Sequence, residues 1–227
     1  MSEPREGRGE KTREAILTAA EAVFAEHGFD GARIDTIADV SGFNKTLIFR
    51  YFGDKLGLYA EVLRRLDRQA SELQAQLLGP LLADETIVSD AHRFRVFLTT
   101  ALEAFFDYIV AHPRVMRMMI WEHAEGWQTY AKIASLFEME GLEQLEALFS
   151  KAQQAGLLRA DFDPLVLFVL AEQICWFFPT SLPFYQMVLP ARDFSSPAAL
   201  ARAREQIVTF LVAGIVVDLP ERKETEQ

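Results

Sequence analysis

The chain has 227 residues, half of them apolar, and a formal net charge of −10 at pH 7. A chain of this length and composition can bury a hydrophobic core, which excludes an intrinsically disordered protein and a small disulfide scaffold. The single cysteine, Cys175, lies in an apolar run and cannot form an internal disulfide, so it favours a reducing cytoplasm as the location.

No export signal or membrane segment is expected. The first eleven residues are polar and charged, unlike the apolar segment of a signal peptide. The two most apolar runs, residues 165–178 and 207–219, are interrupted by Glu172 or too short to span a bilayer. We therefore expect a protein without a membrane partner.

The acidic charge is unevenly distributed along the chain. Through Arg65 there are ten Lys and Arg against eleven Asp and Glu, whereas the remainder holds 13 against 22. Between residues 43 and 55, three cations, Lys45, Arg50 and Lys55, face one acid, Asp54. A local cationic surface can therefore exist on this acidic protein, and its overall charge does not exclude binding to nucleic acid.

Two helices are predicted at the start of the chain. Apolar residues at helical spacing predict the first helix over residues 12–26, and Gly28 is placed to end it in a left-handed conformation. After a short loop, a second and brief helix begins near Ile34 and stops near Gly42.

A third short helix follows at once. Asn44 can cap it, because its side-chain oxygen can accept from the amide of Thr46 or Leu47, and Asp54 can cap a fourth helix in the same way. Three short helices with a glycine-containing turn between the second and third are typical of a helix-turn-helix, whose second member enters a DNA groove.

The rest of the chain is also predicted to be helical, and the fold class is all-α. The fourth helix runs from Lys55 toward Gly79 and Pro80. Further helices are expected over residues 90–111, 113–122, 127–155, 164–178 and 197–217. The apolar segment 179–194, with Pro183 and Pro190, is expected to break the helix and to lie against the body of the protein.

Residues 12–63 carry a composite pattern. It consists of an alanine-rich first helix ending in Phe24 and Gly28, the pair Ile37-Ala38, Val40 and Gly42, the run Leu47 to Phe52, then Asp54-Lys55 and Leu58-Tyr59. This pattern resembles the DNA-binding domain of the tetracycline-repressor (TetR) family. The resemblance implies an N-terminal helix-turn-helix domain and a larger C-terminal helical domain that binds an effector, forms a homodimer and causes release of DNA.

On this basis four segments are expected. They are a flexible arm over residues 1–11, a DNA-binding domain over 12–55, a ligand-binding and dimerisation domain over 56–220, and a polar tail over 221–227. The expected partners are double-stranded DNA with a pseudo-palindromic operator, a small-molecule effector and a second copy of the chain.

Eight residues are expected to contact DNA: Arg33, Asn44, Lys45, Thr46, Phe49, Arg50, Tyr51 and Lys55. Side chains at the N-terminal end of the third helix can approach phosphates or base edges, and Arg50 can form a fork to guanine or phosphate. The family resemblance implies phosphate contacts for Tyr51 and Lys55. Asp35 departs from the family pattern, because a carboxylate repels phosphate; we expect it to face a protein cation or an amino group of cytosine.

Aromatic and methionine residues are dense beyond residue 100, which suits a hydrophobic or amphipathic effector, although such residues are also ordinary core. The pocket candidates are Phe105, Tyr108, Met116, Met119, Trp121, Trp127, Tyr130, Phe168, Glu172 and Trp176. Glu172 interrupts an apolar helix and is therefore a ligand anchor, a bond across the dimer interface or simply exposed. Trp121, Glu122 and His123 form a second group of candidate polar anchors.

Two alternatives to a ligand-controlled repressor stay open. One is a constitutive DNA-binding regulator whose aromatic residues fill its own pocket, and the other is a helical enzyme or small-molecule-binding protein. The four histidines are scattered without the spacing of metal ligands, and no phosphate-binding loop or nucleophile motif is present. We expect no cofactor, no metal and no catalytic residues.

Overall fold

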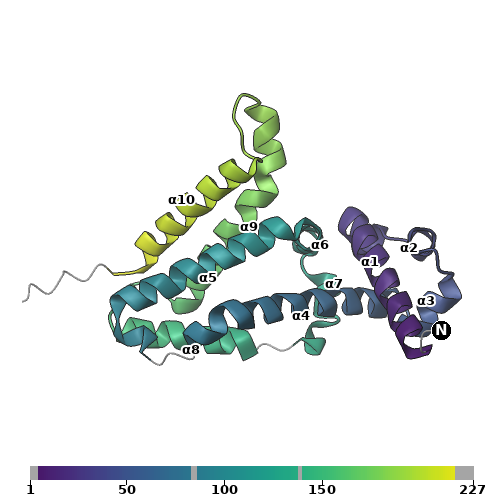
Figure 1. Ribbon diagram of the computed structural model, residues 1–227, viewed down its shortest axis with the longest axis horizontal. Coiled ribbons are helices and arrows are strands. Elements are labelled where there is room, and N and C mark those ends of the chain that lie inside the picture. Colours follow the sequence, from purple (N-terminus) through teal and green to yellow (C-terminus); the bar gives the residue numbers. More distant parts are fainter. Residues whose placement is uncertain (1–4, 83–85, 138–139, 218–227) are drawn as a thin grey trace, which may run out of the picture. The chain divides into compact units, whose positions relative to one another are not determined.

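The computed structural model describes residues 5–82, 86–137 and 140–217 (Figure 1). Residues 1–4 of the expected arm and the expected tail at 221–227 lie outside the described residues. Within the described ranges the chain is helical and forms no strand, apart from one isolated antiparallel bridge between Leu158 and Val216. The prediction of an all-α fold is confirmed.

The helices are named in chain order. They are α1 (Arg5–Gly31), α2 (Ile34–Ser41), α3 (Lys45–Phe52), α4 (Lys55–Leu82), the 3-10 helix η1 (Ile87–Ser89), α5 (Ala91–Ala111), α6 (Pro113–Ala124), α7 (Gln128–Ala131), the 3-10 helix η2 (Ala134–Leu136), α8 (Glu140–Gln154), α9 (Pro164–Val188) and α10 (Pro197–Ile215). The first helix begins at Arg5, earlier than expected, and bends at Gly28, where φ is 69° and ψ is −179°.

The expected helix over residues 127–155 is wrong, because the structure divides it into α7, η2 and α8. Gly126 and Trp127 both have positive φ, of 69° and 62°, so the chain leaves the right-handed helical conformation before α7. Phe137 is extended, with φ −113° and ψ 141°, and ends η2.

The expected break after residue 178 is also wrong, because α9 continues through Pro179 and Pro183 to Val188. Hydroxyl groups add hydrogen bonds near the first proline. The Thr180 hydroxyl donates to the carbonyl of Phe177 at 2.9 Å, and the Ser181 hydroxyl donates to the same carbonyl at 2.9 Å. Such side-chain bonds help a helix to accommodate proline.

The chain divides into two compact units. Unit 1 holds residues up to Glu72 together with 112–138, and unit 2 holds 73–111 together with the residues from 139 onward. In unit 1, α1 packs against α2 and α6; in unit 2, α5 packs against α9, α10 and η1. The expected functional domains, residues 12–55 and 56–220, therefore do not coincide with these two compact units.

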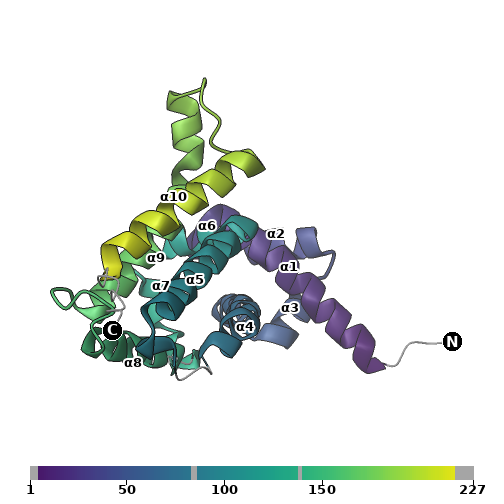
Figure 2. The same cartoon turned by 60° about the vertical axis from the view of Figure 1, so that its left-hand side comes forward.

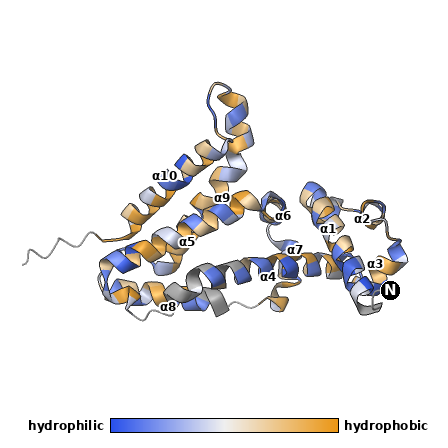
Figure 3. Cartoon of the chain, viewed as in Figure 1, coloured by the Kyte–Doolittle hydropathy of each residue, from blue (hydrophilic) through white to orange (hydrophobic). Residues whose placement is uncertain are grey.

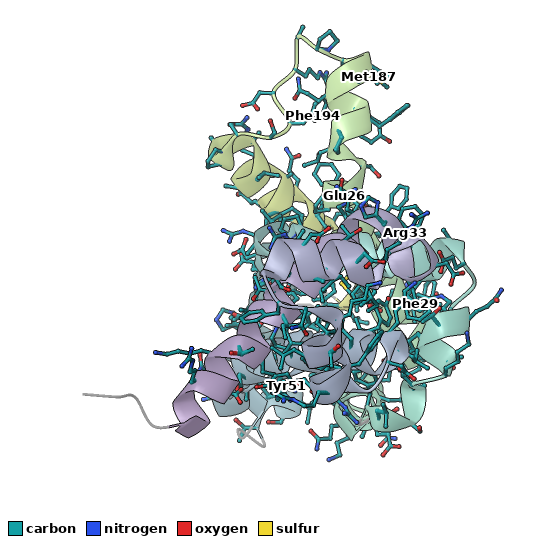
Figure 4. All side chains as sticks on the ribbon, turned by 90° about the vertical axis from the view of Figure 1, so that its right-hand side faces the viewer. Glu26, Phe29, Arg33, Tyr51, Met187 and Phe194 are labelled. Carbon is teal, nitrogen blue, oxygen red and sulfur yellow. The ribbon has the colours of Figure 1, made fainter. Side chains whose placement is uncertain are left out.

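In unit 2, α9 and α10 form a hairpin whose tip stands away from α5 and α8 in both views (Figures 1 and 2). Phe184 and Met187, near the end of α9, are 56% and 71% exposed. Figure 4 labels Met187 on this tip and Phe194 on the segment that leads back to α10. The expectation that residues 179–194 lie against the body is therefore wrong for the α9 part of the segment.

Helix α9 is apolar along much of its length (Figure 3). Its 25 residues have a length and composition that would suffice to cross a membrane, with a mean hydropathy of 1.7 in the most apolar window. The helix is longer than the apolar run over residues 165–178, because it passes through both prolines, and Glu172 still interrupts its apolar sequence. Length and composition alone are weak evidence for a span, since core and interface helices share them.

Cys175 is buried on the inner face of α9, and burial raises the pKa of its thiol to about 11. We expect the native protein to react with a thiol reagent at pH 8 at least about a hundredfold more slowly than the unfolded chain, because both access and thiolate formation are suppressed. A spectrophotometric thiol assay with and without urea checks this. Equal rates in the two states would contradict the burial.

Candidate nucleic-acid interface

The turn between α2 and α3 is set by local interactions. Gly42 adopts the left-handed conformation, with φ 74° and ψ 12°, and its amide donates to the carbonyl of Ala38 at 2.9 Å. Ile37 of α2 and Ile48 of α3 are fully buried, and Phe52 is nearly so. The apolar side of both helices is therefore buried in the core, and the other side of α3 lies on the surface.

Helix α3 begins with a side-chain cap. The Asn44 side-chain oxygen accepts from the amide of Leu47 at 2.9 Å, as the sequence predicted for one of the two candidate amides. The cap fixes where α3 starts and therefore which side chains stand in its first turn.

Replacing Asn44 with alanine is expected to lower the free energy of unfolding by about 1 kcal/mol, because one first-turn amide loses its acceptor. Urea denaturation followed by circular dichroism measures the change. Asn44→Ser is the matched control, since serine also caps helices, and it should cost less than half as much. Equal losses in the two variants would show that the cap is not responsible.

The outward side of α3 carries cationic, hydroxyl and aromatic groups. Lys45, Thr46, Phe49 and Arg50 are all exposed, and the Phe49 ring is 42% exposed. The Arg50 guanidinium carbon lies 5.8 Å from the centroid of the Tyr51 ring. The structure therefore brings five of the eight predicted residues together on one short helix, the arrangement that a major-groove reader requires.

Two other residues, Arg33 and Asp35, lie at the start of α2. Arg33 precedes α2 and is exposed, and Figure 4 labels it together with Tyr51. Lys45 forms an ion pair with Asp35, the first-turn acid of α2. The expectation that Asp35 faces a protein cation is thus confirmed, and its charge offsets that of Lys45 in the structure.

Lys55 is placed differently from the expected phosphate contact. Its ammonium donates to the carbonyl of Asp30 at 3.2 Å and lies 4.6 Å from the centroid of the Phe29 ring. Burial lowers the pKa of Lys55, and the nearby Asp30 carboxylate partly opposes that change. Lys55 thus joins the start of α4 to the end of α1, a role that the sequence did not indicate.

A buried cation joins α4 to α1. Arg65, 8% exposed, donates to Thr18 at 3.1 Å and to Glu14 at 3.3 Å, and it also pairs with Glu21. Since charges this far from water require partners, the three acceptors on α1 fix how α4 lies against it. These contacts fix α1 and α4, the helices that precede and follow the helix-turn-helix in the sequence, against each other.

Sequence reasoning missed a second link, between α6 and the N-terminal helices of unit 1. The Glu122 carboxylate, 1% exposed, accepts from the Tyr59 hydroxyl at 2.7 Å and from the Tyr130 amide at 3.0 Å. The Trp121 indole donates to the carbonyl of Ala25 at 3.4 Å. A tryptophan and a glutamate on one helix gave no signal of these distant partners.

The ten pocket candidates fall into both units. Met116, Met119, Trp121, Trp127 and Tyr130 belong to unit 1, whereas Phe105, Tyr108, Phe168, Glu172 and Trp176 belong to unit 2. Two cavities within the described residues have volumes of about 380 and 300 Å³, and none of the ten lines either. These cavities do not gather the predicted pocket residues.

Glu172 is half-buried on α9, and desolvation raises the pKa of its carboxyl above the ordinary value. The simple alternative of full exposure is therefore wrong. The structure leaves a ligand anchor and a dimer-interface bond as the two other expectations for this residue.

No group of three or more potential metal-ligating His, Cys, Asp or Glu side chains occurs among the described residues. The exposed groups on α3 are donors and an aromatic ring, which suit anion and base contacts.

Comparison with known proteins matches both parts of the chain. Residues 16–62 match the family described as "Bacterial regulatory proteins, tetR family", and residues 95–211 match "Tetracyclin repressor-like, C-terminal domain". The second match alone spans half of the chain.

Individual relatives and structures agree with this. The HTH-type transcriptional repressor NicS of Pseudomonas putida is 26% identical over 77% of this chain and 78% of that protein. The HTH-type transcriptional repressor SCO4008 of Streptomyces coelicolor is 34% identical over 51% of this chain and 52% of that protein. The crystal structure of the transcriptional regulator SCO4942 from Streptomyces coelicolor, 26% identical, matches with a TM-score of 0.60 over 90% of this chain and 98% of that one.

Residues 34–52 form a helix-turn-helix, and the two family matches together cover most of the chain. The chain therefore belongs to the TetR family of bacterial transcription regulators.

Proposed function

We propose that this TetR-family regulator is a repressor that binds a pseudo-palindromic operator as a homodimer and leaves it when a small apolar or amphipathic molecule binds. The observation that carries the DNA-binding part is the exposed side of α3, with Lys45, Thr46, Phe49 and Arg50 on a helix whose other side is buried. The repressor role is supported by the names of NicS and SCO4008.

The residues divide by the contact that each can make. Arg50 reads guanine or clamps phosphate, Phe49 packs on a thymine methyl or a sugar, and Thr46 bonds a base edge or phosphate. Arg33 and Lys45 supply positive charge for the phosphate backbone. Lys55 reaches phosphate only after its ammonium leaves the Asp30 carbonyl, so its first role is to position α4.

Selection from a pool of randomised duplex DNA, with affinities measured at several salt concentrations, tests the proposal. We expect an enriched pseudo-palindrome whose binding weakens steeply with salt, and a roughly 5- to 150-fold loss of affinity in Arg50→Ala. Arg68→Ala, an exposed arginine on α4, removes the same charge as a matched control. No enrichment, or equal losses in the two variants, would contradict the assignment of α3.

Asp35→Asn is expected to raise DNA affinity about three- to tenfold at low salt and to steepen the salt dependence by about one counterion. The substitution removes the ion pair with Lys45, so that Lys45 can bind phosphate. Each additional neutralised phosphate steepens the plot of log binding constant against log salt concentration by about 0.9. Fluorescence anisotropy with the selected duplex measures both quantities. Asp39→Asn, which removes an exposed carboxylate elsewhere on α2, is the matched control, and an equal gain there would point to charge alone.

The homodimer is proposed to form through α9 and α10. Val166, Leu170, Phe177, Phe184 and Val188 are all exposed and share one face of α9, because they recur at intervals of four and seven residues. Phe210 of α10 is 70% exposed. Such an apolar surface is costly in water, and a second copy related by a two-fold axis would cover it.

Light scattering at micromolar concentration tests the dimer, with Phe177→Glu as the disrupting variant and Val40→Glu, an exposed apolar position on α2, as control. A wild-type monomer would overturn the proposal. The same packing accounts for the apolar composition of α9 without a membrane, where the Glu172 carboxylate would be unfavourable. A cytoplasmic location is part of this proposal.

A reporter gene under the selected operator separates repression from activation and ligand control from constitutive binding. Lower reporter expression with the regulator present is the expected result. An increase would identify an activator, and failure of every apolar compound to relieve repression would favour the constitutive alternative.

A further inference from the structure

We infer that the groove between α5 and α10 in unit 2 binds a small apolar molecule with one anionic head, held by Arg204. This inference rests on the proposed function, because it names the chemical class of the effector. The groove has a volume of about 300 Å³, at the lower end of ligand sites, and so suits a single short chain or ring. Its residues are Phe106, Asp107, Val110, Pro197, Leu200, Ala201 and Arg204.

Most of the lining is apolar. Phe106 and Val110 of α5 face Pro197, Leu200 and Ala201 from the first turns of α10. An aliphatic or aromatic part of a ligand gains from contact with these side chains. Arg204 and Asp107 are the two charged lining residues, so the polar part of the ligand must be recognised by that pair.

Arg204 has an unused donor at its Nε. One terminal nitrogen of its guanidinium, Nη1, pairs with the Asp107 carboxylate, whereas the buried Nε has no hydrogen-bond partner. A buried N–H without an acceptor is unusual in proteins and indicates a missing group. Nε and Nη2 together form the side-on fork that matches the two oxygens of a carboxylate; since Nε is buried, the guanidinium must turn this edge toward the groove to bind an anion there.

The field of α10 supports the same charge. Pro197 is its first residue, and Leu200 and Ala201 follow in the first turns, near the positive end of the helix dipole. The Asp107 carboxylate repels an incoming anion, but its ion pair with the Arg204 guanidinium offsets part of that repulsion. The arrangement therefore favours a monoanion over a neutral or cationic molecule of the same shape.

Isothermal titration calorimetry of the full chain with octanoate tests the groove, with 1-octanol and octylamine as neutral and cationic analogues. Octanoate is expected to bind at least about tenfold more tightly than either analogue, and Arg204→Gln to weaken it roughly ten- to a hundredfold. Arg202→Gln, an exposed arginine of α10 outside the groove, is the matched control. Circular dichroism of each variant checks folding.

Asp107→Asn keeps the fork and removes the opposing carboxylate, so it should strengthen octanoate binding severalfold. If Asp107→Asn instead weakens binding as much as Arg204→Gln, the pair merely supports the fold and the inference is overturned. Absence of octanoate binding, or binding that Arg204→Gln leaves unchanged, overturns it as well.

The DNA experiment separates this inference from the proposed function. Octanoate should lower the affinity of the wild-type protein, but not of Arg204→Gln, for the selected duplex. Arg204-dependent octanoate binding without any change in DNA affinity would contradict the effector assignment. If the ligand-free protein selects no duplex, the proposed function fails, whereas calorimetry still decides whether the groove binds an anion.

Discussion

Glu122→Leu is expected to lower the free energy of unfolding by about 3–5 kcal/mol, because two buried donors lose their charged acceptor at once. The carboxylate accepts from the Tyr59 hydroxyl at 2.7 Å and the Tyr130 amide at 3.0 Å, and Tyr59 is 1% exposed. Burial, together with the hydrogen bond to Glu122, raises the pKa of Tyr59, so its hydroxyl remains a donor at neutral pH. Leucine has a similar size but offers no acceptor.

Urea denaturation of the variants separates the hydrogen bonds from packing. Glu122→Gln keeps one acceptor oxygen and should lose less than half as much as Glu122→Leu. The double variant Tyr59→Phe/Glu122→Leu should be more stable than Glu122→Leu alone, because the stranded hydroxyl is gone. A double variant whose loss equals the sum of the two single losses would show that the pair does not interact.

Gly28→Ala is expected to lower the free energy of unfolding by about 2–4 kcal/mol, from backbone strain and overpacking together. At φ 69° and ψ −179°, Gly28 occupies a region that residues with a side chain rarely adopt. A methyl group there would also lie 3.0 Å from Cδ2 of the Trp121 ring, and the ring is held by its bond to Ala25.

Gly31→Ala is the matched control for Gly28. Gly31 lies in the same helix without a positive φ, and its nearest contact for an added methyl is the His27 Cβ at 3.5 Å. Thermal denaturation should show a small change, or a gain, for this variant. The pair Gly28→Ala/Trp121→Ala removes the collision but not the strain, so its loss relative to Trp121→Ala alone divides the effect between the two causes. No loss in Gly28→Ala would contradict the described backbone.

Both sites join α6 to the N-terminal helices. Trp121 packs over the bend in α1, and Glu122 bonds the Tyr59 hydroxyl of α4. In unit 1, α6 is therefore attached to the helices that support α2 and α3. Variants at these positions should be tested for DNA affinity only under conditions in which they remain folded.

The sequence by itself determined the features that depend on neighbours within a few residues. Asn44 caps α3 and α2 stops at Gly42, as the local pattern predicted, whereas Gly28, expected to end the first helix in a left-handed conformation, bends α1 and the helix continues to Gly31. Such caps and turns involve hydrogen bonds across three or four residues, and the same short range makes the helix-turn-helix readable from residues 12–63. Asp35 was expected to face a protein cation or an amino group of cytosine, and the structure supplies the cation, Lys45, ten residues further along the chain.

Only the tertiary structure decided features whose partners lie far along the chain. The hydrogen bond from Tyr59 to Glu122 joins residues 63 positions apart. Lys55, expected to contact phosphate, donates to the carbonyl of Asp30, 25 residues away. Proline predicted a break that α9 does not show. The density of aromatic residues suggested ten pocket candidates, but the structure divides them between the two units. No sequence pattern indicated the groove that Arg204 lines. Helical periodicity tells which face of a helix is apolar, but which other element covers that face depends on packing among segments distant in sequence.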